Sequence, residues 1–246
     1  MIYQAGASDR GRQFAAEHAE AIFTAAPTKE QLKEVVGDIR WRMKAVGRDP
    51  YDARIYTLMT AIVDETREKA WAKHDEYERY ASDEGALVLF SGWMGIDLAE
   101  YDLDDPIGEV ESNAIHSAVR AFQQADNDGR EWKVRDIARW GGLGGLGPRM
   151  VGSAAEVADQ MQEWIEVSDV DGFNLAYAIT PGTFVDLVEH LIPELQRRGV
   201  APIDYPSPTQ TLRQRLFGEG PRLPDRHPGA SYRQLGEQAR LAGAAA

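Results

Sequence analysis

The amino-acid sequence predicts an α/β protein built from parallel βα units. Short apolar runs alternate with stretches of helical periodicity, and no hairpin turn separates one apolar run from the next. The run from Ala53 to Val63 is also apolar on both alternating faces, as expected for a strand that is covered on both sides of a parallel sheet. We therefore expect four βα units along the chain.

The first two units occupy the amino-terminal part of the chain. A short apolar run over 1–5 ends in a small-residue turn, and helical spacing follows from about Phe14. A second short strand is expected over 20–25, and a capping box of Thr28 and Gln31 starts the next helix. The apolar face of that helix is formed by Leu32, Val35, Val36, Ile39, Met43 and Val46.

The third unit carries an insertion. Its strand covers 53–63, and a charged helix follows from about 64 to 80. Residues 82–150 lack the alternation of strand and helix, so we assign them to a helical insertion between the third and fourth strands. One helix of this insertion is expected near 112–124.

The fourth unit follows the insertion. A capping box of Ser153 and Glu156 begins a helix that leads to a strand over 171–177. Thr180 and Pro181 suit the cap and the first turn of the last helix. We expect the four strands to be parallel and adjacent in chain order, with helices on the outer side of the sheet only.

The last helix ends at Gly199, because glycine adopts the left-handed conformation that commonly terminates helices. The segment from 200 to 246 is rich in Pro, Arg and Gly. We expect it to form a tail that lies on the surface or is disordered.

The composition limits the class of function. The 246 residues carry a formal net charge of −13, so the phosphate backbone of a nucleic acid would be repelled and we expect no nucleic-acid partner. The chain has no cysteine, which excludes disulfides, thiolate metal sites and a cysteine nucleophile, and the five histidines lack metal-binding spacing. Neither a signal peptide nor a membrane-spanning run is found, and we expect a cytoplasmic protein with no membrane partner.

The small-residue turn Gly6-Ala7-Ser8, between a strand and a helix, is a candidate anion site. The first N–H groups of a helix lack intrahelical partners, and the helix dipole favours negative charge there. Ser8 could donate its hydroxyl to a phosphate, and Arg10 or Arg12 could add positive charge. An ordinary capped turn, with Ser8 or Asp9 as the N-cap, fits the same residues, so both interpretations stay open.

A second glycine-rich segment is a weaker candidate. Gly142, Gly144 and Gly147 satisfy the G-x-G-x-x-G pattern, but Pro148 follows directly and no strand is expected before them. A dinucleotide loop needs a strand before it and a helix after it. We therefore expect 141–147 to be an irregular, mobile loop that binds no dinucleotide and that could act as a lid.

Three long stretches carry a resemblance to a known family. "YQAGASDRGRQFAAEHAEAIFTA", "VGSAAEVADQMQEW" and "DGFNLAYAITPGTFVDLVEHLIPELQRRG" resemble, in this order, the bacterial-luciferase-like flavin monooxygenases. The subfamily is that of the nitrilotriacetate, pristinamycin-synthase and dibenzothiophene-sulfone monooxygenases. The resemblance runs through nearly the whole chain and covers about the carboxy-terminal half of such a protein.

The resemblance implies the carboxy-terminal half of a (β/α)8 TIM barrel. Residues 1–199 would carry strands five to eight, with the insertion over about 82–150, and 200–246 would form the tail. The amino-terminal half would then be missing, and the chain would be an N-terminally truncated form. A four-stranded half cannot close a barrel by itself.

The resemblance also implies a chemistry. Such enzymes are two-component monooxygenases that oxygenate a small organic substrate with O2 and reduced FMN, which a separate flavin reductase supplies, and the full-length proteins are homo-oligomers. The family's phosphate turn corresponds to Ser8, with the backbone of Asp9 and Arg10 as helpers. The resemblance assigns no catalytic residue in this half. Two alternatives stay open: an inactive fragment or half-barrel that binds a partner chain, and a deazaflavin-dependent oxidoreductase of the same superfamily.

Overall fold

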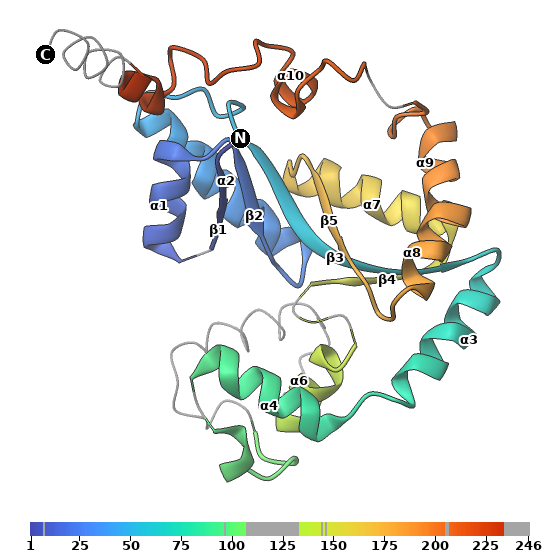
Figure 1. Cartoon of the computed structure of the whole chain (residues 1–246). Coiled ribbons are helices and arrows are strands. Elements are labelled where there is room, and N and C mark those ends of the chain that lie inside the picture. The colour runs from blue at the N-terminus through green and yellow to red at the C-terminus, as the bar shows by residue number, and fades with distance from the viewer. Residues whose placement is uncertain are drawn as a thin grey trace, which may run out of the picture.

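A computed structural model describes residues 1–6, 8–95, 97–106, 133–143, 145, 147–204 and 207–233. It is an α/β protein with one parallel sheet, viewed in Figure 1 from its concave side. The strands within the described residues are β1 (Tyr3–Ala5), β2 (Ala21–Thr24), β3 (Arg54–Asp64), β4 (Arg149–Ser153) and β5 (Gly172–Ala176).

Most helices begin at a serine or threonine cap. The helices of the described residues are α1 (Asp9–His18), α2 (Lys29–Ala45), α3 (Arg67–Glu78), α4 (Asp83–Met94), α6 (Val134–Gly141), α7 (Ala154–Ser168), α8 (Gly182–Asp186), α9 (Ile192–Arg197) and α10 (Leu212–Phe217). The cap hydroxyl accepts a hydrogen bond from the N–H three residues later at Ser8, Thr28, Thr66, Ser82, Ser153 and Thr211. Each such cap stabilises its helix by about 1 kcal/mol.

The four strands expected from the sequence are parallel and adjacent in chain order, as predicted. β1 pairs with β2, β2 with β3, and β3 with β5. The 11-residue strand β3 is central, because it pairs along both of its edges.

Strand β4 was not predicted from the sequence. Thr60 of β3 pairs with Arg149 of β4 and also with Ala176 of β5, so β4 and β5 lie on opposite edges of β3. β4 therefore pairs with the same edge of β3 as β2 does; β2 pairs near the start of β3 and β4 near its end. The strand escaped detection because only Met150 and Val151 are large apolar residues and Ser153 already belongs to the following helix cap.

The main core lies between the sheet and the helices behind it. Alternate residues of β3, such as Ile55, Met59 and Val63, are fully buried against α1, α2 and α7. Burying a large aliphatic side chain contributes roughly 1.5–3 kcal/mol.

The expectation that helices cover only one side of the sheet was wrong at α3. Ile62 and Val151, which alternate with the residues of the main core, pack with Ala70 of α3 and with Leu143. α3 therefore covers the opposite face of the sheet. The pairing of β3 with β2 stops at Thr57 and that with β5 stops at Thr60, so the end of β3 extends beyond both strands and pairs there only with β4.

Three further expectations concern particular segments. α4 and α6 lie within the expected insertion, whereas the helix expected at 112–124 falls outside the described residues.

The glycine segment expected over 141–147 is not irregular throughout, because Gly141 is the last residue of α6 and lies against the Phe90 ring. Thr180 makes no cap hydrogen bond in the described structure, since Pro181 occupies the cap position of α8.

The tail lies on the surface where the structure describes it. Residues 207–233, including α10, cross the amino-terminal ends of β1, β2 and β3 (Figure 1). No helix among the described residues is long and apolar enough to span a membrane.

Candidate functional site

The turn between β1 and α1 is built closely enough to receive an anion. Ser8 caps α1, and its Oγ accepts a hydrogen bond from the N–H of Gly11 at 3.1 Å. Gly6 has a φ of +134°, and a Cβ on Gly11 would lie 3.2 Å from the Gly6 carbonyl oxygen. Both glycines therefore allow the strand to turn directly into the helix.

Groups that can donate hydrogen bonds are available at this turn. The Ser8 hydroxyl acts as an acceptor toward Gly11, which leaves its own proton available for a ligand. The N–H groups of Asp9 and Arg10 have no acceptor among the described residues, as is normal in the first turn of a helix. The turn thus fits a phosphate group, although an unliganded helix cap has the same geometry.

The charge around the turn also fits a phosphate. The Asp9 carboxylate is paired with the Arg42 guanidinium, whose Nη2 lies 2.5 Å away. Hydrogen bonds to Asp38 and Asp9 raise the pKa of Arg42, so it stays protonated. The exposed Arg10 has no ion pair within the described part of the chain and is available to an incoming anion. No local pattern in the sequence points to Arg42, because it comes from a different helix.

A concave face lies next to this turn. Ala5, Phe23, Tyr56 and Gly172 are Cα partners across four strands and form one row on the side opposite the main core. The Tyr56 ring packs across Gly172, where a Cβ would lie 3.2 Å from the ring.

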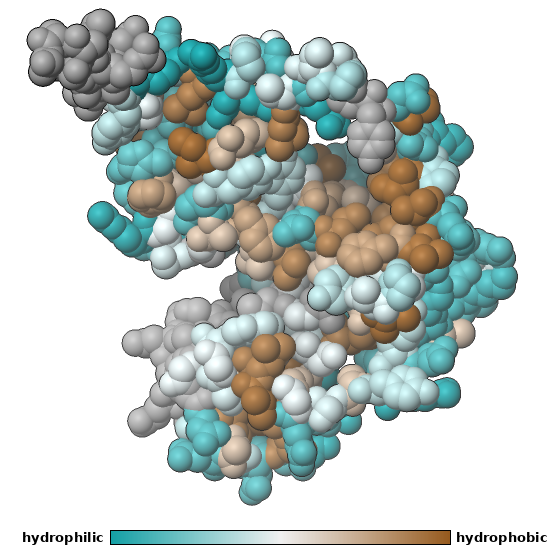
Figure 2. Space-filling model, in the orientation of Figure 1, coloured by the Kyte–Doolittle hydropathy of each residue, from teal (hydrophilic) through white to brown (hydrophobic). Residues whose placement is uncertain are grey.

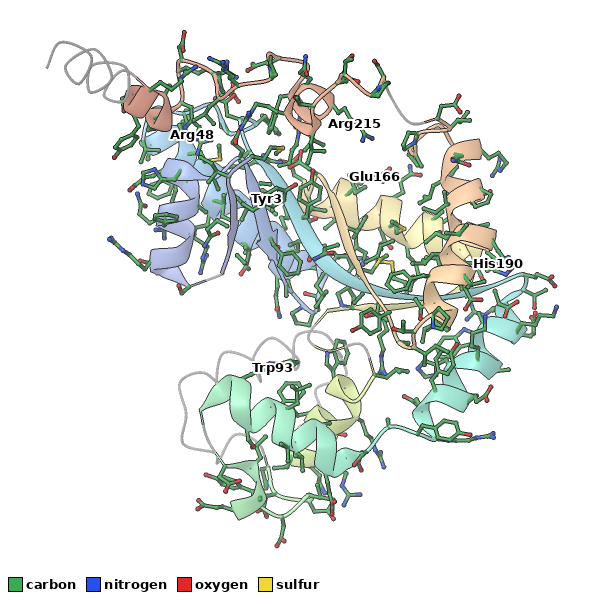
Figure 3. All side chains as sticks on the ribbon, viewed as in Figure 1. Tyr3, Arg48, Trp93, Glu166, His190 and Arg215 are labelled. Atoms are coloured by element: carbon green, nitrogen blue, oxygen red, sulfur yellow. The ribbon has the colours of Figure 1, made fainter. Side chains whose placement is uncertain are left out.

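Aromatic and aliphatic side chains dominate this concave face. Tyr3 projects from it and is 60% exposed; it is labelled in Figure 3. Burial, with smaller effects from Tyr3 and Asp171, raises the pKa of Tyr56. Figure 2 shows apolar surface over β3, β5 and α8 in the hollow between the tail and the helices α4 and α6. Such a face suits a flat aromatic ligand or further strands.

Tyr56 was not singled out as a site residue from the sequence. It lies within the strand that was predicted over 53–63, and the alternation of buried and half-buried residues in β3 identifies the side to which it belongs. That alternation is visible in the sequence only as a long apolar run, which does not reveal which face remains open.

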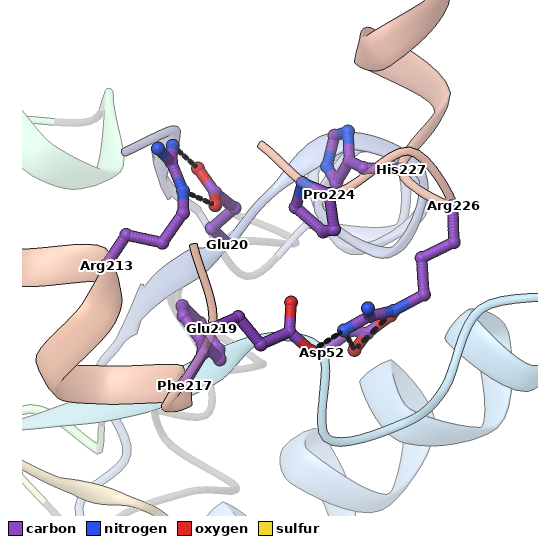
Figure 4. A pocket seen from close by; sticks show the side chains of 8 residues that line it. All are labelled: Glu20, Asp52, Arg213, Phe217, Glu219, Pro224, Arg226 and His227. Atoms are coloured by element: carbon purple, nitrogen blue, oxygen red, sulfur yellow. Dashed lines mark hydrogen bonds and ion pairs between the residues drawn. The ribbon is translucent and has the colours of Figure 1, made fainter. Parts of the chain in front are cut away.

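A cluster of charged residues at the opposite ends of the strands has a structural role (Figure 4). The Glu20 carboxylate accepts hydrogen bonds from Nε and Nη2 of Arg213 at 2.6 and 2.8 Å, and Arg226 pairs with Asp52 and Glu219. The cavity between these residues measures about 10 Å³, which is room for one water molecule. These pairs hold the tail against the sheet and leave no space for a substrate.

A groove on the outer side of the sheet lies beside β5. It has a volume of about 600 Å³ and is lined by residues of α7, β5 and α9, including Met161, Phe173, Leu175 and Leu195. These side chains are apolar; Met161 is buried, whereas Phe173, Leu175 and Leu195 are only partly covered.

Comparisons with known proteins identify the family to which this fold and site belong. The family described as Luciferase-like monooxygenase matches residues 2–170. Dimethyl-sulfide monooxygenase of Hyphomicrobium sulfonivorans is 41% identical over 234 residues, which are 95% of this chain and 48% of that protein. Nitrilotriacetate monooxygenase component A of Aminobacter aminovorans is 32% identical over 219 residues, which are 88% and 48% of the two chains.

Solved structures agree with this assignment. The crystal structure of DmoA from Hyphomicrobium sulfonivorans superposes with a TM-score of 0.83 at 40% identity, over 94% of this chain and 48% of that one. The structure of riboflavin lyase RcaE with modified FMN and riboflavin superposes with a TM-score of 0.77 at 35% identity, over 94% and 50%.

The chain spans about half the length of the curated relatives that it matches. The family match covers well over half of the chain itself, from β1 to the residues before β5. The chain therefore belongs to the Luciferase-like monooxygenase family.

Proposed function

We propose that this chain supplies the phosphate-binding half of the flavin site of an FMN-dependent monooxygenase. The observation that carries the proposal is the tight turn from β1 to α1, with Ser8 as its cap, beside an open concave face. The family supports a flavin as the ligand, and the similarity to a riboflavin lyase solved with modified FMN points to FMN.

The residues that would hold the phosphate are Ser8, through its hydroxyl, and Asp9 and Arg10, through their N–H groups. The dipole of α1 and the Arg10 guanidinium would add favourable charge. When bound, reduced FMN supplies the electrons that activate O2 for transfer to a small organic substrate. The chain's part is to position the phosphate and to present the concave face to the ring. We infer a separate flavin reductase as the electron donor, because one relative is named as a component of a monooxygenase.

The architecture we propose is the carboxy-terminal half of a (β/α)8 barrel. β1, β2, β3 and β5 would be four of its eight strands, and the concave face would line its interior. Active sites of such barrels lie at the carboxyl ends of the strands, which is where Ser8 lies relative to β1.

A single copy should bind FMN weakly. Each hydrogen bond to the charged phosphate contributes roughly 1.5–3 kcal/mol, and a few of these must offset an association cost of at least about 4 kcal/mol. The isoalloxazine ring would gain little, because only one side of it would be covered. We expect a dissociation constant for FMN that is weaker than micromolar for one copy.

Comparing FMN with riboflavin tests the phosphate site, because the two ligands differ only by the phosphate. Flavin fluorescence should report tighter binding of FMN than of riboflavin. Ser8→Ala should reduce the preference for FMN over riboflavin by about tenfold, because it removes one hydrogen bond to a charged group. The matched control is Ser82→Ala, which removes an equivalent cap from α4. Equal binding of the two flavins, or an unchanged preference in Ser8→Ala, would refute the assignment.

A further inference from the structure

We propose that a second copy of this chain completes the sheet, so that two copies form one eight-stranded barrel around a two-fold axis. This inference rests on the half-barrel of the proposed function. It goes beyond that function because it names the molecule that covers the concave face and predicts the residues that meet.

The two ends of the sheet are complementary. Among the described residues, β1 pairs only with β2 and β5 pairs only with β3, so each presents an unpaired edge. All strands are parallel, so β1 of one copy can join β5 of its partner as a further parallel neighbour. A two-fold axis along the barrel creates this joint twice and closes both copies at once. The path of four strands is half of the eight that a closed barrel requires.

The register of the strands predicts which residues meet at the joint. The row of Cα partners runs from Ala5 through Phe23 and Tyr56 to Gly172. A barrel of this type has a shear of about 8 residues, so each identical half must contribute about 4. If the row of Cα partners is continued from Gly172 into the second copy, it therefore reaches that copy at the position four residues before Ala5. Ala5 then pairs with Ala176 of the other copy.

Two features of the chain agree with this register. A shift of four residues in the opposite direction would bring β1 opposite residues that belong to α7, so only one direction allows strand pairing. Ala5 and Ala176 also lie on the same, concave side of the sheet, whereas the neighbouring Leu175 packs into the core on the other side. Side chains of paired residues must share a face, and a slip by one residue would break this match.

Exposed apolar side chains flank both edges and would be buried by the second copy. Around β1 these are Ile2, Tyr3 and, in the following helix α1, Phe14; after β5 they are Tyr177 directly behind the strand and Val185 and Val188 in the following helical segment, with exposures between 37% and 66%. A side chain of this size has an accessible surface of about 150–200 Å² in all, so the exposed parts of these six amount to roughly 500 Å² per copy that a second copy could bury. The backbone of the two edges adds to this, toward the roughly 800 Å² per partner that is typical of specific interfaces.

Charge opposes this association. Each copy carries a net charge of −13, so two copies repel each other at low salt. Screening over about 8–10 Å at physiological ionic strength reduces the repulsion. We therefore expect dimerisation to strengthen as salt is raised.

Sedimentation equilibrium of the unmodified chain is the first test. We expect a reversible shift from the chain mass of 27.3 kDa to twice that mass, and the dimer fraction should increase with salt. A monomer at all concentrations and salts would overturn the proposal.

Engineered cysteines test the register, and the absence of natural cysteine makes the result unambiguous. In one copy Ala5 and Ala176 are separated by three strand spacings across the sheet and by four residues along it, roughly 20 Å in all, which is too far for an internal disulfide. Oxidation of an Ala5→Cys/Ala176→Cys variant should therefore yield a covalent dimer on a non-reducing gel. The control is Gln4→Cys/Ala176→Cys, which places the two sulfurs on opposite faces and should not cross-link.

Equal cross-linking of the two variants, or none in the first, would contradict the predicted joint. Cross-linking that occurs only when a different polypeptide is added would contradict it as well. Neither measurement uses flavin, so the failure of this inference is distinguishable from failure of the phosphate site. A cross-linked dimer without FMN preference would refute only the proposed function, and an FMN-binding monomer would refute only the dimer.

Discussion

Replacing Arg213 by alanine should destabilise the protein by removing the main partner of a buried carboxylate. Glu20 is only 2% exposed and accepts hydrogen bonds from Nε and Nη2 of Arg213 and from the N–H of Ile2. The variant leaves only the Ile2 hydrogen bond. Arg213 comes from the tail and Glu20 precedes β2, so the change also removes one of the ion pairs that hold the tail against the sheet.

The size of the effect follows from the geometry. Removing one partner of a buried ion pair costs roughly 3–5 kcal/mol, because the remaining charge stays away from water. Arg213 is partly accessible, and water can replace it in part, which places our expectation at about 3 kcal/mol at neutral pH. The effect is large beside the 5–15 kcal/mol typical of whole-protein stability.

The loss should depend on pH. Burial raises the pKa of Glu20, but the hydrogen bonds from Arg213 and Ile2 outweigh it and hold the pKa below its ordinary value of 4.5. A depressed carboxyl pKa contributes stability that is present above about pH 4.5 and is lost as pH falls through the folded-state pKa. The difference between the variant and the original chain should therefore be large at pH 7 and should shrink below pH 4.

Urea unfolding at pH 7 and at pH 3.5, followed by circular dichroism, measures both effects. The matched control is Arg215→Ala, from the same helix, whose exposed side chain is labelled in Figure 3. It should change the free energy of unfolding by less than about 0.5 kcal/mol. The role assigned to the ion pair is refuted if Arg213→Ala resembles this control at pH 7, or if its loss is as large at pH 3.5 as at pH 7.

Two further substitutions test other parts of the fold. Burial lowers the pKa of His227, whose Nδ1 accepts from the Gly229 N–H, so the stability that it contributes is complete above about pH 6.5 and declines as pH falls. His227→Gln should make the melting temperature fall less between pH 7 and pH 5. An unchanged fall in melting temperature would contradict this role of His227. Gly147→Ala would bring a Cβ to 2.9 Å from the Leu58 carbonyl oxygen and should cost about 1–3 kcal/mol, whereas Gly220→Ala meets nothing within 4 Å and should be near neutral. Equal stability of these two glycine variants in urea would contradict the close packing of Gly147 on β3.

Local patterns predicted the elements whose signals lie within a few residues. The strand over 53–63 and the caps at Ser8, Thr28 and Ser153 depend on neighbouring residues, and the structure has them. β4 was missed because its five residues include only two large apolar side chains and overlap a helix cap.

Features that depend on distant pairing could not be predicted from the sequence. Glu20 and Arg213 are 193 residues apart, and no periodicity links them. Arg42 reaches Asp9 from another helix, and the open side of β3 follows only from the register with β2 and β5. The position of α3 on the concave side likewise depends on how far β3 extends beyond β2 and β5. Ser8 as a phosphate ligand remains a prediction.

A crystal structure of the chain with FMN tests the central claim most directly. We predict that the phosphate lies at the first turn of α1, within hydrogen-bond distance of the Ser8 hydroxyl and of the N–H groups of Asp9 and Arg10, with the ring over the concave face near Tyr56. An FMN phosphate bound elsewhere on the chain, with the turn between β1 and α1 unchanged and unliganded, would contradict the account.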